Sequence, residues 1–348
     1  KRTNISDKPG ITVALISGIG MAFVNPLEYE PIRWQGQIYG TSKNIEEMNW
    51  YLRFPIMFFC ALSIFGFYFL IRKLWGEDIA LFSSIFIGLS PLLLGISRII
   101  NPDSLLWIFT SFSILCWFIY FKKDFKKGYL YWSGIFLGLS LLTKYIANIL
   151  YVFFFAIIFF EYIFDRKNYD MAEVGSYLKK RLLDYLILVF ISFMVFILLF
   201  PATWIEFSFL FRATILSQAF EKVKYVFLLI LGIVFWDMYI MKSTLTSSFF
   251  RILGKYRKII TQGIILIFIL SVVFVILNTY SGMKWMDFES ILASPKSAFK
   301  TTWIWGIFLA NFYSMVFGVI PLALFATIYA CFKKIGKINQ GIDNFFLY

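Results

Sequence analysis

A run of 36 residues, from Tyr129 to Phe164, carries only two charged side chains, Lys144 and Glu161. As one helix it would be about 54 Å long, whereas the hydrocarbon core of a bilayer is about 30 Å thick. The run is too long for one crossing and slightly short of two full ones, so the first helix of a pair would be short. It therefore predicts two membrane-spanning helices that join near Thr143 and Lys144, with one lysine at the junction.

Further apolar segments of crossing length recur along the chain. Sixty per cent of the residues are hydrophobic and 15% are charged, which is outside the range of a soluble globular domain. The fold class expected is an all-α polytopic membrane protein with about nine transmembrane helices and interfacial helices in the outside loops. The predicted crossings are 53–71, 79–95, 104–121, 130–143, 146–164, 184–202, 224–240, 259–277 and 303–331.

Basic loops follow every second predicted crossing and give the orientation. We assign their side to the cytoplasm, because lysine and arginine are enriched in cytoplasmic loops. This also explains the net charge of +13 without a nucleic-acid partner. The apolar stretch 10–24 is too short to span and predicts an interfacial or re-entrant helix. The basic loops lie at 72–73, 122–127, 165–181, 251–258 and 333–334.

Three parts of the chain follow from this orientation. Residues 1–52 are expected to be part of the first extracytoplasmic loop, and residues 53–332 the transmembrane helical bundle. Residues 333–348 are expected to be a cytoplasmic tail or the start of a truncated segment. The chain lacks an initial methionine and a signal-peptide pattern, so we expect a piece of a longer multi-pass protein of the plasma (inner) membrane.

The residue types restrict the chemistry. The chain has no histidine, which excludes histidine-based acid–base catalysis, Ser-His-Asp triads and histidine-bound metals. Its three cysteines form no CxxC pair, so neither a zinc site nor a disulfide framework is expected. No metal site is predicted, and any cation taking part would be a hard ion such as Mg²⁺ or Mn²⁺ held by carboxylates.

Three charged clusters remain on the predicted outside. Lys144 either extends toward the lipid headgroups or binds an anion in an aqueous cavity. In "SRIINPD" (97–103), Asp103 either caps the helix expected from Ser104 or pairs with Arg98. Alternatively, Arg98 contacts a phosphate and Asp103 orients a substrate hydroxyl.

The third cluster is "SDKPGIT" (6–12), in which Asp7 and Lys8 precede a Pro-Gly turn. Either this is an ordinary turn at a membrane boundary, or it adds a second lysine and a carboxylate to the same site. If the three clusters converge, Lys8, Arg98 and Lys144 would bind a phosphate. A carboxylate beside them would act as a general base on a hydroxyl or amine.

The order of these motifs resembles that of the polytopic glycosyltransferases of the C-type fold, which use polyprenyl-phosphate sugars. Their relatives include protein O-mannosyltransferases and the lipid A aminoarabinose transferase. The resemblance covers roughly residues 6–205. It rests on "DKPGIT", "RFPIMFFCALSIFGFYFLIRKLWG", "IGLSPLLLGISRIINPD", "GIFLGLSLLTKY" and "FPATW" in this order.

The resemblance implies a role for each matching residue. Lys8 would lie near the donor phosphate, Asp103 would be the acidic residue before the next crossing, and Lys144 would line the donor cavity. One sugar would be transferred with inversion on the non-cytoplasmic side. The family's main carboxylate usually lies soon after an N-terminal crossing that this sequence does not contain, so Asp103 and Asp7 are the candidate catalytic residues. Gly10 replaces a frequent second proline.

The sequence therefore predicts a membrane glycosyltransferase with a polyprenyl-phosphate sugar donor. The acceptor would be a lipid, a glycan or a protein, and the surrounding membrane lipids would be its other partners. A secondary transporter of an anionic or sugar substrate is the alternative, although the inverted repeats expected of one are not evident. A flippase or polymerase for lipid-linked glycans and a non-enzymatic scaffold are further alternatives.

Overall fold

The computed structural model describes most of the first 257 residues and a few beyond them. Every regular element in these ranges is a helix. The predicted crossing at 303–331 lies outside the described residues, and so does most of the one at 259–277. The described residues are 10–23, 45–123, 125–165, 171–217, 220–257, 259–260, 262–263, 266–267 and 270.

The chain divides into two units. The first comprises residues 1–158 and 176–239, and the second comprises residues 159–175 and 240–348. In the second unit, the described residues include helix α12 (Thr244–Lys255), and the rings of Tyr162 and Phe250 pack with their centroids 4.8 Å apart. The candidate site residues that the structure describes all belong to the first unit.

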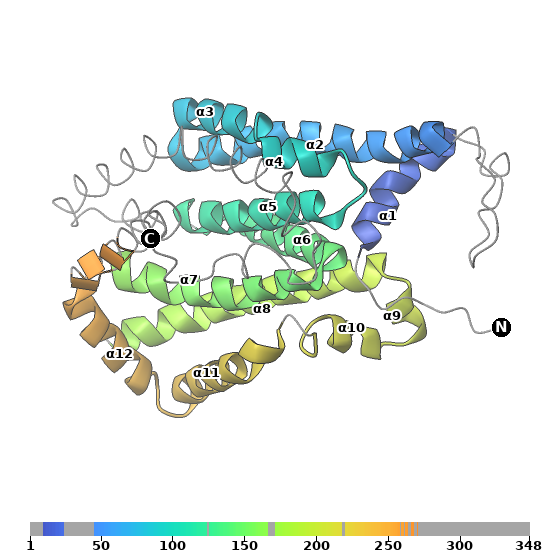
Figure 1. Cartoon of the computed structure of the whole chain (residues 1–348). Helices are drawn as coiled ribbons and strands as arrows, with labels where there is room; N and C mark the ends of the chain where they lie inside the picture. Colours follow the sequence, from blue (N-terminus) through green and yellow to red (C-terminus); the bar gives the residue numbers. More distant parts are fainter. Residues whose placement is uncertain are drawn as a thin grey trace, which may run out of the picture. The chain divides into compact units, whose positions relative to one another are not determined.

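Helix α2 (Ile45–Trp75) has 31 residues and ends at Gly76, whose φ of 98° stops the helix and reverses the chain. Helix α3 (Glu77–Gly88) then packs back along α2, and its first turn carries Glu77 and Asp78, which suit the positive end of the helix dipole. The short helix α4 (Pro91–Ser97) follows, with Ser90 as its cap (Figure 1). The crossing predicted at 79–95 is therefore broken near Leu89.

Helices α5 (Pro102–Lys122) and α6 (Lys127–Thr143) form an antiparallel hairpin that also packs against α2. The hairpin turn lies at the end of the bundle where α2 finishes. Lys73 Nζ donates to the Tyr129 hydroxyl at 2.6 Å, and the Lys122 ammonium contacts the Leu74 carbonyl. Two of the predicted basic loops thus lie at one end, as their spacing predicted.

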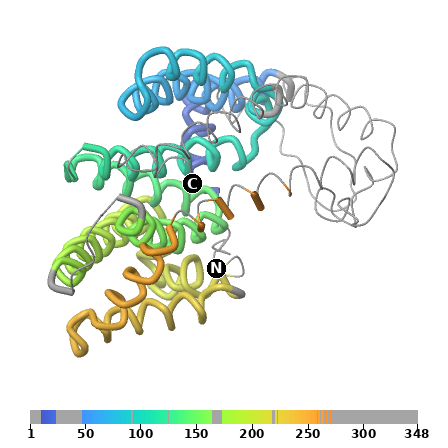
Figure 2. Tube along the Cα trace, turned by 90° about the vertical axis from the view of Figure 1, so that its left-hand side faces the viewer, coloured from blue at the N-terminus to red at the C-terminus, as the bar shows by residue number. Residues whose placement is uncertain are grey.

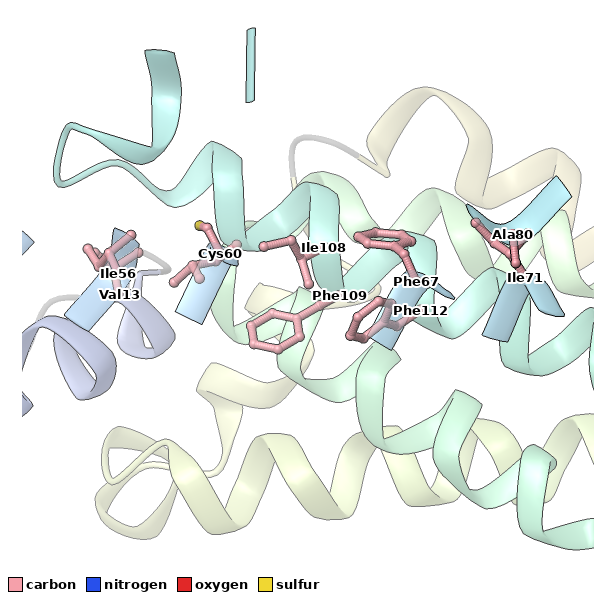
Figure 3. Packing of buried hydrophobic residues seen from close by; sticks show 10 residues of the cluster. Val13, Ile56, Cys60, Phe67, Ile71, Ala80, Ile108, Phe109 and Phe112 are labelled. Atoms are coloured by element: carbon pink, nitrogen blue, oxygen red, sulfur yellow. The ribbon is translucent and has the colours of Figure 1, made fainter. Parts of the chain in front are cut away.

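Buried side chains fill the interface between α2 and α5. Figure 3 shows this cluster running from Val13 and Ile56 to Ile71 and Ala80, with Phe67 and Phe112 between them. The last two rings meet edge to face at 4.7 Å. Burial of these side chains against α2 holds the α5–α6 hairpin in place, and with it the far ends of both hairpin helices.

Helix α1 (Ile11–Gly18) packs against α2 and against both hairpin helices, and the 3-10 helix η1 (Ile19–Phe23) packs against α2 (Figure 2). Ser17 Oγ donates to the Leu52 carbonyl at 2.8 Å, and Thr12 and Val13 are buried. Together the two helices have thirteen residues (8 + 5), too few to cross a bilayer. The length expected for this segment is confirmed.

After α6 the chain makes the 3-10 helix η3 (Tyr145–Asn148) and enters α7 (Ile149–Asp165). The helix break expected near Thr143 is therefore present. Helix α8 (Met171–Leu199) lies beside α6 and is followed by three further helices of the first unit. These are α9 (Ala202–Ile205), α10 (Ser208–Ala213) and α11 (Glu221–Tyr239).

In the described part of the chain, four helices are long and apolar enough to cross a membrane, and a fifth span is reached if α11 and α12 are taken as one bent crossing. This supports an integral, multi-pass membrane protein. The total of about nine crossings stays a prediction, because part of the chain lies outside the described residues. The four spans are 47–75, 102–122, 145–163 and 173–199.

Candidate functional site

Lys144 and Asp103 meet at the end of the hairpin opposite its turn. Lys144 follows the last residue of α6 in an extended conformation, and its backbone N–H donates to the Ser140 carbonyl at 2.9 Å. Its Nζ lies 2.7 Å from Asp103 Oδ1. The two side chains are 45% and 44% exposed, so the protein covers each of them only in part.

Each of the two charges also suits the helix that carries it. Asp103 lies in the first turn of α5, near the positive end of the helix dipole, and Lys144 follows α6 at the negative end. Asn101 caps α5 by accepting from the Asp103 N–H at 2.9 Å, so the cap by Asp103 itself, one of the alternatives left open by the sequence, is not formed. An ion pair this exposed contributes about 0–1 kcal/mol to stability, which leaves both groups free to exchange partners.

Two residues of "DKPGIT", Gly10 and Thr12, contact two residues of "LLTKY", Leu142 and Thr143. The Gly10 N–H donates to the Leu142 carbonyl at 2.9 Å, and the hydroxyls of Thr12 and Thr143 lie 2.6 Å apart in a buried hydrogen bond. Gly10 has φ +129°, which favours glycine over any residue with a side chain. Proline could neither adopt this φ nor donate this hydrogen bond.

The remaining candidate residues are not all placed. Asp7 and Lys8 lie outside the described residues. Arg98 is exposed after the last residue of α4 and makes no ion pair within the described ranges. Asp103 bonds to Lys144 rather than to Arg98, so the Arg98–Asp103 pair considered from the sequence is not formed.

A second charged cluster lies at the opposite end of the first unit. Arg181 Nη1 and Asp184 Oδ2 are 3.1 Å apart and almost fully buried, and the Tyr120 hydroxyl contacts both groups. The Arg181 guanidinium also stacks 3.6 Å from the Phe125 ring centroid. Arg181 was expected in a basic loop. That expectation is wrong because α8 already begins at Met171 and turns Arg181 inward.

The described ranges contain no group of three or more carboxylates or thiols placed to hold a metal ion together. The features that organise the Lys144 end are thus a half-exposed ion pair, two helix ends and the docked α1 segment. Lysine is a donor suited to a phosphate, and a carboxylate next to it is suited to accept a proton from a hydroxyl or amine.

The fold and the site define a multi-pass helical membrane protein with an ion pair at one end of its bundle. Residues 41–196 match the family model described as dolichyl-phosphate-mannose-protein mannosyltransferase, and this part of the chain is a domain of that family. The family consists of membrane glycosyltransferases with a polyprenyl-phosphate sugar donor. The match includes Arg98, Asp103 and Lys144. No curated protein and no solved structure gives a significant match.

Proposed function

We propose that the chain transfers a sugar, with inversion, from a polyprenyl-phosphate donor to a lipid, glycan or protein acceptor on the extracytoplasmic side of the membrane. The observation that carries the proposal is the ion pair between Lys144 and Asp103, within the residues that match the family. It brings a phosphate-binding group and a proton-accepting group to one place that solvent reaches.

The position of the α1 segment supports a shared site for the donor phosphate. Gly10 is hydrogen-bonded to α6 two residues before Lys144, and Lys8 precedes Gly10 by two residues. A chain spans at most about 3.6 Å per residue, so a side chain as long as that of lysine could reach the same phosphate. Arg98, at the exposed end of α4, is a further candidate for this phosphate.

In the proposed reaction the donor phosphate replaces Asp103 as the ion-pair partner of Lys144, which frees the Asp103 carboxylate. The carboxylate accepts the proton of an acceptor O–H or N–H group while the acceptor atom attacks the anomeric carbon. The bond between that carbon and the phosphate oxygen breaks, and the electron pair leaves on the polyprenyl phosphate. Lys144 stabilises the negative charge on this leaving group.

The test is transfer of radiolabelled sugar from a polyprenyl-phosphate hexose by the full-length protein in lipid vesicles. Lys144→Ala should raise the donor KM or lower kcat/KM by 100-fold or more, of the order expected for loss of one charged transition-state contact of about 3 kcal/mol. Asp103→Asn should lower kcat. Neither change should lower stability by more than about 1 kcal/mol, because the pair is half-exposed.

Lys73→Ala is the matched control, because Lys73 also donates a hydrogen bond to a neighbouring helix but lies at the other end of the bundle. Its transfer rate should match that of the unmodified protein. Full transfer by Lys144→Ala would disprove the phosphate role. Movement of the labelled donor across the vesicle membrane without any transfer would instead favour a transporter.

A further inference from the structure

Asn148 is the last residue of η3, four residues after Lys144, and only 1% of it is exposed. Its Nδ2 donates to the Ala213 carbonyl at 2.9 Å and to Ser217 Oγ at 2.9 Å. Both partners belong to the segment after α8, more than sixty residues away in the sequence. Nδ2 also lies 2.8 Å from the Tyr145 carbonyl within its own turn.

These contacts fix the direction of the amide group. Two of the neighbours of Nδ2 are carbonyl oxygens, which only accept hydrogen bonds, so this atom must be the nitrogen. Asn148 Oδ1 is buried and has no hydrogen-bond partner among the residues that the structure describes. A buried unpaired acceptor has an energetic cost, so the hydrogen bonds of Nδ2 must outweigh it.

The same contacts restrain the backbone next to Lys144. The Lys144 carbonyl accepts from the Ala147 N–H at 3.1 Å, and the Tyr145 carbonyl lies 2.8 Å from Asn148 Nδ2. Residues 144–148 therefore form one hydrogen-bonded turn. Ala213 and Ser217, in the chain after α8, bind this turn through the side chain of Asn148.

We propose that Asn148 is a positioning residue, which fixes the turn so that the Lys144 ammonium stays beside Asp103. It does not touch the reacting atoms. Its part in catalysis rests on the proposed function, whereas its effect on the position of Lys144 does not. Loss of Asn148 should let the turn change conformation, break the ion pair part of the time and weaken the hold of Lys144 on the donor phosphate.

The first measurement is the rate at which an amine-acylating reagent modifies Lys144, followed by mass spectrometry of the full chain in lipid nanodiscs. Asn148→Ala should speed the labelling of Lys144 about fivefold, which corresponds to a net loss of about 1 kcal/mol when its hydrogen bonds to Ala213 and Ser217 are removed. Labelling of Lys73, which is hydrogen-bonded at the other end of the bundle, should not change. Ser217→Ala removes only one of the contacts and should give a smaller increase.

Ser113→Ala is the matched control. Ser113 is fully buried and donates to the Ser133 carbonyl at 2.8 Å, so its loss also deletes one buried hydrogen bond, but away from the site. It should leave the labelling of Lys144 unchanged. If Asn148→Ala does not speed this labelling, or speeds that of Lys73 equally, the positioning role is wrong.

The second measurement is the kinetics of sugar transfer from the donor, in the lipid vesicles of the transfer assay described above. Asn148→Ala should raise the donor KM about fivefold with a smaller change in kcat, while Ser113→Ala should change neither at a matched loss of melting temperature. If both variants lowered the amount of active protein equally, the role of Asn148 would be structural only. Faster Lys144 labelling in a protein that transfers no sugar would leave the positioning intact and refute the proposed function.

Discussion

Gly138 lies where α6 and α8 pack closely, and replacing it with alanine should force the two helices apart. A Cβ atom at this position would lie 2.7 Å from the Ser192 carbonyl oxygen and 2.7 Å from Val195 Cβ. Ordinary contact begins at about 3.4 Å, so relief of the contact with Ser192 requires a shift of about 0.7 Å (3.4 minus 2.7). The atom in the way is backbone, which cannot rotate aside.

Extra volume at a packed interface typically costs about 1–3 kcal/mol. We therefore expect Gly138→Ala to lower the folded-to-unfolded ratio by at least about fivefold and the melting temperature by roughly 3–10 °C. The assay is thermal unfolding of the purified protein in detergent, read from the fraction that stays monodisperse. Because α6 ends next to Lys144, sugar transfer should fall as well.

Gly128→Ala is the control within the same helix, because nothing lies within 4 Å of a Cβ atom there. Alanine is the better helix former, so this change should be neutral or stabilising by up to about 1 kcal/mol. If Gly138→Ala is as stable as Gly128→Ala, the close approach of α6 and α8 is wrong.

Two further predictions concern backbone strain and buried charge. Gly10→Ala has free space but an unfavourable φ, so it should cost about 1–3 kcal/mol in a melting experiment, and Gly10→Pro should cost more because it also deletes the bond to Leu142. Asp184→Asn leaves the buried Arg181 guanidinium without its counter-charge and should cost about 3–5 kcal/mol or prevent folding, with partial recovery when Arg181→Met is added. If Asp184→Asn melted at the same temperature as the unmodified protein, this would contradict the buried ion pair.

Much of the Lys144 end could be predicted from the sequence. The length of the apolar run required a break near its middle, and the lysine there marked the break. The basic loop at 122–127 and Pro102 set the ends of α5 and α6, and an antiparallel hairpin then brings Asp103 and Lys144 to one end. The contact between Thr12 and Thr143 could not be predicted, because it depends on how α1 packs against α6.

The errors have physical causes of the same kind. Hydropathy treats Arg181 as a charge that must lie in water, whereas Tyr120 and Asp184 supply partners for it inside the bundle. Its spacing of three residues from Asp184 is a signal that could have indicated the pair. The stretch 79–95 carries no charge, but Ser90 and Pro91 within it start a new helix, and a count of apolar residues overlooks such a restart.

Because Lys144 directly follows α6, the direction in which it points depends on the rotation of α6 about its own axis, the angular phase of the helix. An α-helix turns by about 100° per residue, so one residue inserted between Lys127 and Thr143 would swing the lysine that follows α6 about a quarter of the way around its axis. The same insertion among residues 123–126 would leave that phase untouched. Length changes should therefore be tolerated in the connecting loop and abolish the Asp103 contact when they fall within the helix.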